Sequence, residues 1–270
     1  MMSRLDIYIT DKGLAKSRER AKKLIKNGKV TLNGKICVKP SAEVSEHDNV
    51  KVDNTDEEIV GRGLLKLEKA FDAFKISIEG KVCADIGAST GGFTQCMLRH
   101  GASFVYAVDV GHGQLDLCLC NDSRVKNCEG VNARYLERSF FDVTPQFMSV
   151  DLSFISLKLV IPALSKCICE NSEMAVLIKP QFEAGKSALN KKGIVKNIND
   201  HIRVLNDLTA CFQQNGLSVE GLVPSSILGG DGNIEYLAYL KRTNSISKFM
   251  LDFDIKKFTN ETFASFGKIK

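Results

Sequence analysis

Apolar residues recur with helical spacing in the first thirty positions. Ala21, Leu24 and Ile25 share one face of a segment that starts after Ser17 and stops before Gly28, which is typical of an amphipathic helix. Ser17 can cap the first turn of this helix, and Gly28 can adopt the left-handed conformation that ends it. The pattern therefore predicts a helix that runs to about residue 27.

Two short runs of alternating apolar and polar residues follow, on either side of Asn33-Gly34. This dipeptide is the strongest short sequence signal for a hairpin turn, so helix and hairpin together indicate a small α+β domain. Residues 53–58 are acidic and rich in turn formers, which indicates a linker. We expect a domain boundary near residue 58, with residues 1–58 forming the small domain and its linker.

Beyond residue 59 the pattern changes to strands alternating with helices, which is typical of the α/β class. Strands are predicted at 82–86, 104–108, 147–151, 174–178, 218–223 and 234–239, and helices at 64–74, 157–167 and 201–214, with a further helix ending at Leu98. A glycine-rich turn joins the last two strands. We expect a Rossmann-like domain over residues 59–243 that ends in an antiparallel hairpin, whereas residues 244–270 match no pattern that assigns them a role.

Charge is distributed unevenly along the chain. The first 39 residues hold eleven Lys or Arg and three acidic residues, while the remainder holds 26 basic and 29 acidic residues. A basic domain in front of a nearly neutral one is expected of a protein that binds a phosphate backbone. Charge alone leaves a solvated basic surface equally open, but the four-residue spacing of Arg18, Lys22 and Lys26 favours binding. The candidate RNA-binding residues are Arg4, Arg18, Arg20, Lys22, Lys23, Lys26 and Arg62.

The chain lacks the sequence signals of membrane insertion, export and metal binding. Its most apolar long stretch, residues 150–169, contains Asp151, Lys158 and Lys166, so we expect no membrane span. No apolar signal-peptide core is present near the N-terminus, and we expect a cytoplasmic protein whose nine cysteines are thiols. Two Cys-x-Cys pairs lack the partners of a zinc site, so we expect no metal.

A glycine-rich turn, Gly87-Ala88-Ser89-Thr90-Gly91-Gly92, directly follows the strand predicted over 82–86 and opens a helix. Glycines let a ligand approach the backbone, and the N-terminus of a helix offers free N–H groups. The turn has neither the Gly-x-Gly-x-x-Gly spacing of a dinucleotide site nor the Gly-Lys-Ser/Thr of a P-loop. Ligand contacts are expected from Gly87, Ala88, Ser89, Gly91, Gly92 and Phe93.

Two acidic residues frame this turn. Asp85 stands two positions before it, and Asp109 ends the next strand, where a carboxylate can accept hydrogen bonds from both hydroxyls of a ribose. Such a pair suits a ligand with an amino-acid tail, a ribose and no phosphate, as in S-adenosylmethionine, with Val110 beside it. A tight structural turn, with Asp109 as a helix cap, is the less favoured alternative.

Four ionisable residues are candidates for catalysis of methyl transfer. A ribose 2'-hydroxyl attacks a methyl group poorly until its pKa is lowered or its proton is removed, and a buried lysine can do both. Lys179, which ends a predicted strand, is the favoured residue. Lys66 is the second cation, and Asp151 and Glu235 are expected to hold the lysine geometry. Each residue alone has an ordinary ion pair as its alternative.

Residues 4–52 resemble the S4 RNA-binding domain. The segments that carry the resemblance are Arg4-Leu5-Asp6, Gly13-Leu14-Ala15, Ser17-Arg18, Leu24-Ile25, Asn33-Gly34-Lys35 and Lys39-Pro40. The resemblance implies binding to structured ribosomal RNA through shape and phosphate contacts. Arg4-Leu5-Asp6 is expected to pack against the first helix of this domain.

Residues 4–242 as a whole resemble the TlyA, or haemolysin A, family. The motifs are Gly61-Arg62-Gly63-Leu64-Leu65-Lys66-Leu67, the 85–94 segment, Ala107-Val108-Asp109-Val110-Gly111, Asn132-Ala133-Arg134, Asp151-Leu152-Ser153-Phe154, Ile178-Lys179-Pro180-Gln181-Phe182-Glu183 and Asn233-Ile234-Glu235. The resemblance implies 2'-O-methylation of cytidine in ribosomal RNA, on the RNA or a ribosomal subunit, by an FtsJ-like fold. Lys66, Asp151, Lys179 and Glu235 then form the catalytic set, and Asn132 and Ala133 join the cofactor site.

Two rival functions were weighed against this one. The family name also suggests a secreted membrane-lysing protein without enzymatic activity, but the chain has no export signal and no long cationic amphipathic helix beyond the small domain. An RNA base methylase would need an Asn-Pro-Pro-Phe-like motif or a cysteine nucleophile, and Asp151-Leu152-Ser153-Phe154 offers neither.

Overall fold

The structure is a computed structural model that describes residues 2–15, 17–53, 59–243 and 248–267. The chain divides into two compact units, Met1–Glu58 and Ile59–Lys270, and each is described by itself. Five of the six residues of the predicted linker, 54–58, lie outside the described residues.

The first unit is a small α+β domain. Its elements are β1 Ser3–Arg4, α1 Leu5–Asp11, α2 Arg18–Lys26, β2 Val30–Leu32, β3 Lys35–Ile36, β4 Glu43–Val44 and β5 Val50–Val52. The strands pair antiparallel in the orders β3-β2-β5 and β1-β4. Helix α2 confirms the predicted helix, because the Ser17 side chain accepts a hydrogen bond from the Arg20 backbone N–H and Gly28 has a φ of +72°. The predicted hairpin is confirmed between β2 and β3.

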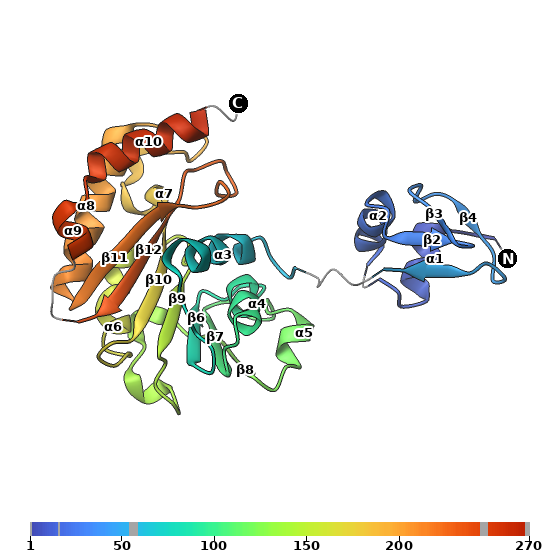
Figure 1. Cartoon of the computed structure of the whole chain (residues 1–270), viewed down its shortest axis with the longest axis horizontal. Helices are drawn as coiled ribbons and strands as arrows, with labels where there is room; N and C mark the ends of the chain where they lie inside the picture. The colour runs from blue at the N-terminus through green and yellow to red at the C-terminus, as the bar shows by residue number, and fades with distance from the viewer. Residues whose placement is uncertain (1, 16, 54–58, 244–247, 268–270) are drawn as a thin grey trace. The chain divides into compact units, whose positions relative to one another are not determined.

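A seven-stranded sheet forms the centre of the second unit (Figure 1). Its strands are β6 Val82–Ile86, β7 Phe104–Asp109, β8 Val125–Glu129, β9 Phe147–Val150, β10 Glu173–Ile178, β11 Leu217–Pro224 and β12 Tyr236–Arg242, in the spatial order β11-β12-β10-β9-β6-β7-β8. Strands β6 to β10 pair in parallel, whereas β12 is antiparallel to both β10 and β11. The predicted α/β fold with a closing antiparallel hairpin is confirmed.

Helices cover both faces of this sheet (Figure 1). On one face α3 Gly63–Phe74 and α4 Gly92–Arg99 share a core with Cys83, Ala107 and Leu177. On the other, α8 Ile198–Gln214 packs on a core that includes Ala84 and Ile86. The short helices α5 Leu117–Cys120, α6 Ile161–Leu164 and α7 Pro180–Glu183 lie in the connections. Successive residues of a strand therefore face different cores, as the pleat requires.

Three parts of this unit differ from the sequence prediction. Strand β8 was not predicted. The predicted helix over 157–167 is instead a 3₁₀ turn, Leu157–Leu159, followed by the four-residue α6, because Pro162 has no backbone N–H to bond back into the preceding turn. Residues 248–267, which no pattern assigned, form α9 Lys248–Asp252 and α10 Ile255–Gly267, and α10 packs against α8.

Among the helices of the described residues, none combines the length and the apolar character that crossing a membrane would demand.

Candidate active site

The carboxyl ends of the parallel strands meet at one edge of the sheet, and the loops that follow them enclose a pocket of about 440 Å³. Ligands bind at this edge in open α/β sheets. The lining residues come from the loops after β6, β7, β8 and β9 and include seven that the sequence predicted: Gly87, Ser89, Asp109, Val110, Asn132, Ala133 and Asp151. The pocket thus gathers residues that are up to 73 positions apart in the chain, from Gly87 to Val160.

Gly87 and Asp109 shape the floor of the pocket. Gly87 has a φ of +88°, and a Cβ there would collide with the backbone carbonyl of Asp151, so only glycine fits between the two loops. The Asp109 carboxylate accepts hydrogen bonds from the backbone N–H groups of Ser89, at 2.8 Å, and Gly111, at 2.7 Å. These bonds hold the carboxylate in place while each oxygen retains a free lone pair for a ligand hydroxyl.

Five residues predicted to contact the ligand do not line the pocket: Asp85, Ala88, Gly91, Gly92 and Phe93. Phe93 belongs to the core beneath α3, and Gly92 lies against the backbone of α3. A Cβ on Gly91 would collide with Leu119. Glycine at positions 91 and 92 therefore allows α4 to pack closely against its neighbours, and the ligand contacts expected at these five residues stay a prediction.

Asp85 lies entirely inside the domain. Its carboxyl accepts hydrogen bonds from the hydroxyls of Thr94, at 2.7 Å, and Ser149, at 3.1 Å. Burial, which disfavours the charged form, raises the pKa of Asp85 to about 7. The pleat explains the position, because Ala84 and Ile86 face one core and Asp85 between them faces α4.

One wall of the pocket depends on Glu129, at the end of β8. Glu129 was not predicted as a site residue. The Glu129 carboxylate accepts hydrogen bonds from the backbone N–H groups of Gly113, Gln114 and Leu115, and these bonds lower its pKa to about 2. They fix the loop that brings Gln114 to the pocket. The sequence contains no signal for this role, because the composition of β8 resembles that of a loop.

Phe154, which also lines the pocket, was not predicted as a site residue. Its side chain is 91% exposed, its φ is +63°, and its ring lies 5.1 Å from that of Phe182. A bulky residue in the left-handed region is strained and indicates a functional constraint. Glu183 holds this loop by accepting hydrogen bonds from the Ser156 hydroxyl, at 2.6 Å, and the Leu157 backbone N–H, at 2.7 Å.

The four predicted catalytic residues meet at the same sheet edge as two ion pairs. Lys179 Nζ lies 2.5 Å from Asp151 Oδ1 and donates a hydrogen bond to Ser153 Oγ at 2.9 Å. Lys66 Nζ lies 2.7 Å from Glu235 Oε2. The Lys66 side chain is only 12% exposed, so it is not the exposed surface lysine that the sequence left open.

Gln181, to which the sequence assigned no role, contacts one of the two ion pairs. It follows Lys179 by two residues, and its Nε2 donates a hydrogen bond to Glu235 Oε1 at 3.1 Å. Both oxygens of Glu235 therefore have donors, one charged and one neutral. A carboxylate with two donors is fixed in orientation, which suits a group that positions a lysine.

The basic residues of the first unit are placed in different ways. Arg4 and Arg18 both pair with the buried carboxylate of Asp6, at 3.0 and 2.9 Å, and lower its pKa to about 2. Leu5 and Asp6 thus lie in the first turn of α1 itself, and the pair with Arg18 joins that turn to α2. Lys22 pairs with Glu19. Lys23 and Lys26 are exposed, as is Arg62 in the second unit. Arg20 donates through its backbone to the Ser17 cap.

Comparison with known families gives two matches. Residues 59–242 match the model of the FtsJ-like methyltransferases, and residues 3–50 match that of the S4 domain. The first match covers more than half of the chain.

Individual relatives agree with these matches. The 16S/23S rRNA (cytidine-2'-O)-methyltransferase TlyA of Mycobacterium tuberculosis is 40% identical over 240 residues, which cover 88% of this chain and 90% of the relative. Hemolysin A of Brachyspira hyodysenteriae is 40% identical over 237 residues, covering 87% and 98%. A solved structure from Streptococcus thermophilus, provisionally named a hemolysin, is 41% identical with a TM-score of 0.75 and covers 99% of this chain and 98% of that one. The chain therefore belongs to the FtsJ-like methyltransferase family, carries an S4 domain, and is related to TlyA and Hemolysin A.

Proposed function

We propose that this protein transfers the methyl group of S-adenosylmethionine to the ribose 2'-hydroxyl of a cytidine in ribosomal RNA. The observation that carries the proposal is the ion pair of Lys179 with Asp151, because Asp151 also lines the pocket. The reacting hydroxyl and the methyl donor can therefore meet beside one lysine. The choice of cytidine rests on the activity for which the Mycobacterium tuberculosis relative is named.

The pocket suits S-adenosylmethionine in three respects. Asp109 presents a fixed carboxylate for the ribose hydroxyls, and Gly87 lets the ligand approach the backbone. Val110 is 67% exposed beside them and offers apolar surface to an adenine ring. Asn132, whose side chain caps a 3₁₀ turn, and Ala133 complete that side of the pocket. When bound, the cofactor supplies a methyl group on a positively charged sulfur.

Lys179 is proposed as the group that receives the proton of the 2'-hydroxyl. Its Nζ would orient the hydroxyl and take up this proton when the oxygen receives the methyl group that the bound cofactor supplies. The resulting ammonium is stabilised by Asp151, 2.5 Å away. Ser153 Oγ, at 2.9 Å, orients the same Nζ. Lys66, held by Glu235, supplies a second positive charge to oppose charge on the oxygen.

The RNA is proposed to contact both units. Residues 1–58 serve as the RNA-binding domain and linker through Lys23, Lys26 and the other predicted basic residues, and residues 59–243 serve as the catalytic domain. Phe154 offers an exposed ring at the pocket on which the target base can stack, as bases do on aromatic side chains in single-stranded RNA recognition. A ribosomal RNA substrate also places the protein in the cytoplasm.

The test is methylation of ribosomal subunits by the purified protein with S-adenosylmethionine, followed by nuclease digestion and mass spectrometry. We expect 2'-O-methylcytidine with the wild type and almost none with Lys179→Met. Methyl groups on a base would contradict the reaction class. Erythrocyte lysis that is equal for the wild type and Lys179→Met, without methyl transfer by either, would favour the lytic function that the name Hemolysin A suggests.

A further inference from the structure

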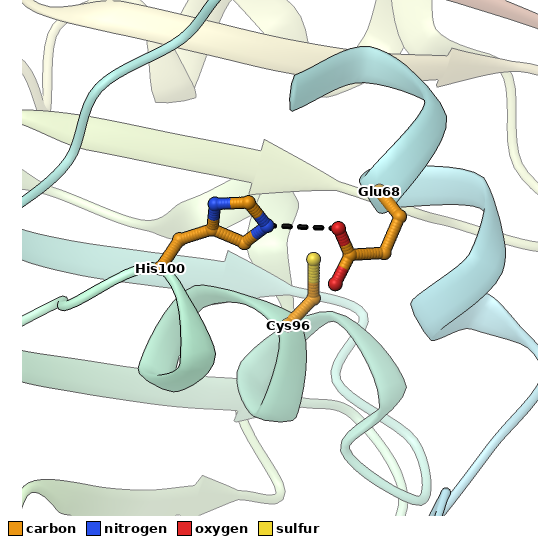
Figure 2. A group of neighbouring side chains, drawn as sticks. All are labelled: Glu68, Cys96 and His100. Carbon is orange, nitrogen blue, oxygen red and sulfur yellow. Dashed lines mark hydrogen bonds and ion pairs between the residues drawn. The ribbon is translucent and has the colours of Figure 1, made fainter. Parts of the chain in front are cut away.

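Glu68, Cys96 and His100 converge where α3 packs against α4 (Figure 2). Glu68 extends from α3, and Cys96 and His100 extend from α4, where a separation of four residues places them on the same helix face. One donor atom from each residue lies within 4.8 Å of the other two. The group is distinct from the pocket and from the two ion pairs, none of which includes these residues.

We propose that these three residues bind one Zn²⁺ ion. A thiolate sulfur, an imidazole nitrogen and a carboxylate oxygen are the donor types that zinc takes in proteins, whereas magnesium and calcium take oxygen donors. Zinc sites with three protein ligands complete their tetrahedron with a water molecule. The mixed donor set of this cluster therefore favours zinc over magnesium and calcium.

The present geometry is close to that of a zinc site. His100 Nε2 lies 2.8 Å from Glu68 Oε2, and donors that share a tetrahedral zinc lie about 3.3 to 3.7 Å apart, from zinc–ligand bonds of about 2.0 to 2.3 Å. A zinc ion that replaces the hydrogen bond needs the two side chains to separate by less than about 1 Å. Rotation of surface side chains accomplishes such a change without moving the helices.

Burial and packing also suit a bound cation. Cys96 is buried below the site, whereas the side chains of His100 and Glu68 are 33% and 31% exposed. The ion therefore has access from solvent and room for a water ligand on its outer side. The Phe71 ring stacks on the His100 ring at 4.1 Å between centroids. Because the stack already restricts rotation of the imidazole, metal binding costs less conformational entropy.

The expectation of no metal rested on the two Cys-x-Cys pairs. The proposed ligands come from two helices, and 28 positions separate Glu68 from Cys96. The sequence therefore shows none of the short ligand spacings that are typical of zinc sites. An ion at this place joins α3, which carries Lys66, to α4, which begins at the glycine-rich turn. The expected role is to stabilise the packing of these two helices, and the proposal does not depend on the identity of the methylated RNA.

The test uses the full-length protein, freed of metal with a chelator and titrated with Co²⁺ as a spectroscopic probe of zinc sites. The wild type should bind one equivalent with a thiolate-to-cobalt charge-transfer band in the near ultraviolet, and Zn²⁺ should displace it. Cys96→Ser should lose this band. Cys118→Ser, which alters an exposed cysteine, should keep it.

A second measurement covers the chance that the Cys96 variant folds poorly. His100 and Glu68 are partly exposed, so His100→Ala and Glu68→Gln should fold. One equivalent of Zn²⁺ should raise the melting temperature of the wild type, and each of these variants should lose most of that rise. A wild type without the cobalt band, or a band and a stabilisation that persist in Cys96→Ser and His100→Ala, would overturn the proposal.

Discussion

Lys66 and Glu235 form an ion pair at 2.7 Å although 169 positions separate them in the chain. Lys66 lies on the helix that precedes the first strand of the large sheet, and Glu235 directly precedes the last strand. Because β12 runs antiparallel to β10, its beginning lies at the carboxyl edge where the parallel strands end. The direction of one strand thus brings the two ends of the catalytic domain together at the proposed site.

The first prediction concerns this pair. Glu235→Gln should lower the single-turnover methylation rate about 10-fold or more, because it leaves the charge of the nearly buried Lys66 without a partner. Lys66→Met should lower it to a similar extent. The double variant should be no slower than the slower single variant, since the residues act as a unit. Losses that multiply in the double variant would show that the two residues act independently.

Lys179 should determine the rate of methyl transfer and should have little effect on the affinity for RNA or cofactor. Lys179→Met should reduce the single-turnover rate about 100-fold or more with RNA and cofactor saturating, as expected for loss of a general base. Dissociation constants for both ligands should stay within a few-fold of wild type. Lys166→Met changes an exposed lysine and is the matched control. A near-normal rate in Lys179→Met would contradict the mechanism.

Asp109 should determine cofactor affinity. Asp109→Asn should weaken S-adenosylmethionine binding about 10-fold, because a neutral amide makes weaker hydrogen bonds to the ribose hydroxyls than a carboxylate does. Calorimetry on the full-length protein measures this change. Asp142→Asn, at an exposed aspartate paired with Lys126, should leave the affinity unaltered. Equal affinity in Asp109→Asn and wild type would remove Asp109 from the proposed ribose site.

The basic face of α2 should contribute electrostatic affinity for RNA. Replacing both Lys23 and Lys26 by alanine should weaken binding to ribosomal RNA and reduce the slope of log affinity against log salt by about 1 to 2, since each phosphate contact contributes about 0.7 to 0.9. The single-turnover rate at saturating RNA should be unchanged. Binding that does not depend on salt in the wild type would argue against phosphate recognition by this domain.

Asp85 should make stability depend on pH. Its pKa is raised from 3.8 to about 7, so between these values the native state holds a proton that the unfolded chain has lost. The contribution of Asp85 to stability is therefore greatest at low pH and falls as the pH rises towards 7. Asp85→Asn removes the ionisable group, and its stability relative to wild type should rise by about 2 to 3 kcal/mol between pH 5 and pH 8. Urea unfolding measures the difference, and an equal difference at both pH values would mean that Asp85 is already ionised at pH 5.

Strands with a continuous apolar core were predictable, and less regular elements were not. Val82–Ile86 and Glu173–Ile178 are buried on both faces. Their short continuous apolar runs are typical of strands inside a parallel sheet. Strand β8 carries Lys126, Asn127 and Glu129 among its five residues, so its composition resembles a loop. It becomes a strand because the edge of β7 offers backbone partners, and no local pattern reports such a tertiary effect.

The sequence indicated where the proposed catalytic residues lie along the chain, but it did not indicate which of them form ion pairs with one another. Strand ends indicated that Asp151 and Lys179 share an edge, yet the bond between Lys66 and Glu235 depends on how α3 packs and on the direction of β12. The face that Asp85 occupies follows from strand alternation, because its neighbours Ala84 and Ile86 point to the opposite core. Phe154 gave no signal, since its exposure and strained φ arise from tertiary structure.

The position of β12 between β10 and β11 has a consequence for the order in which the domain is completed during synthesis. Strand β11 leaves the ribosome first but has no place beside β10, since that place belongs to the strand made after it. The two strands must therefore pair with each other before docking, or β12 must insert between them, and both routes require contacts that are distant in sequence and slow to form. Glu235 takes its place only when this last hairpin docks. A nascent chain that already has its cofactor pocket therefore still lacks the ion pair between Lys66 and Glu235.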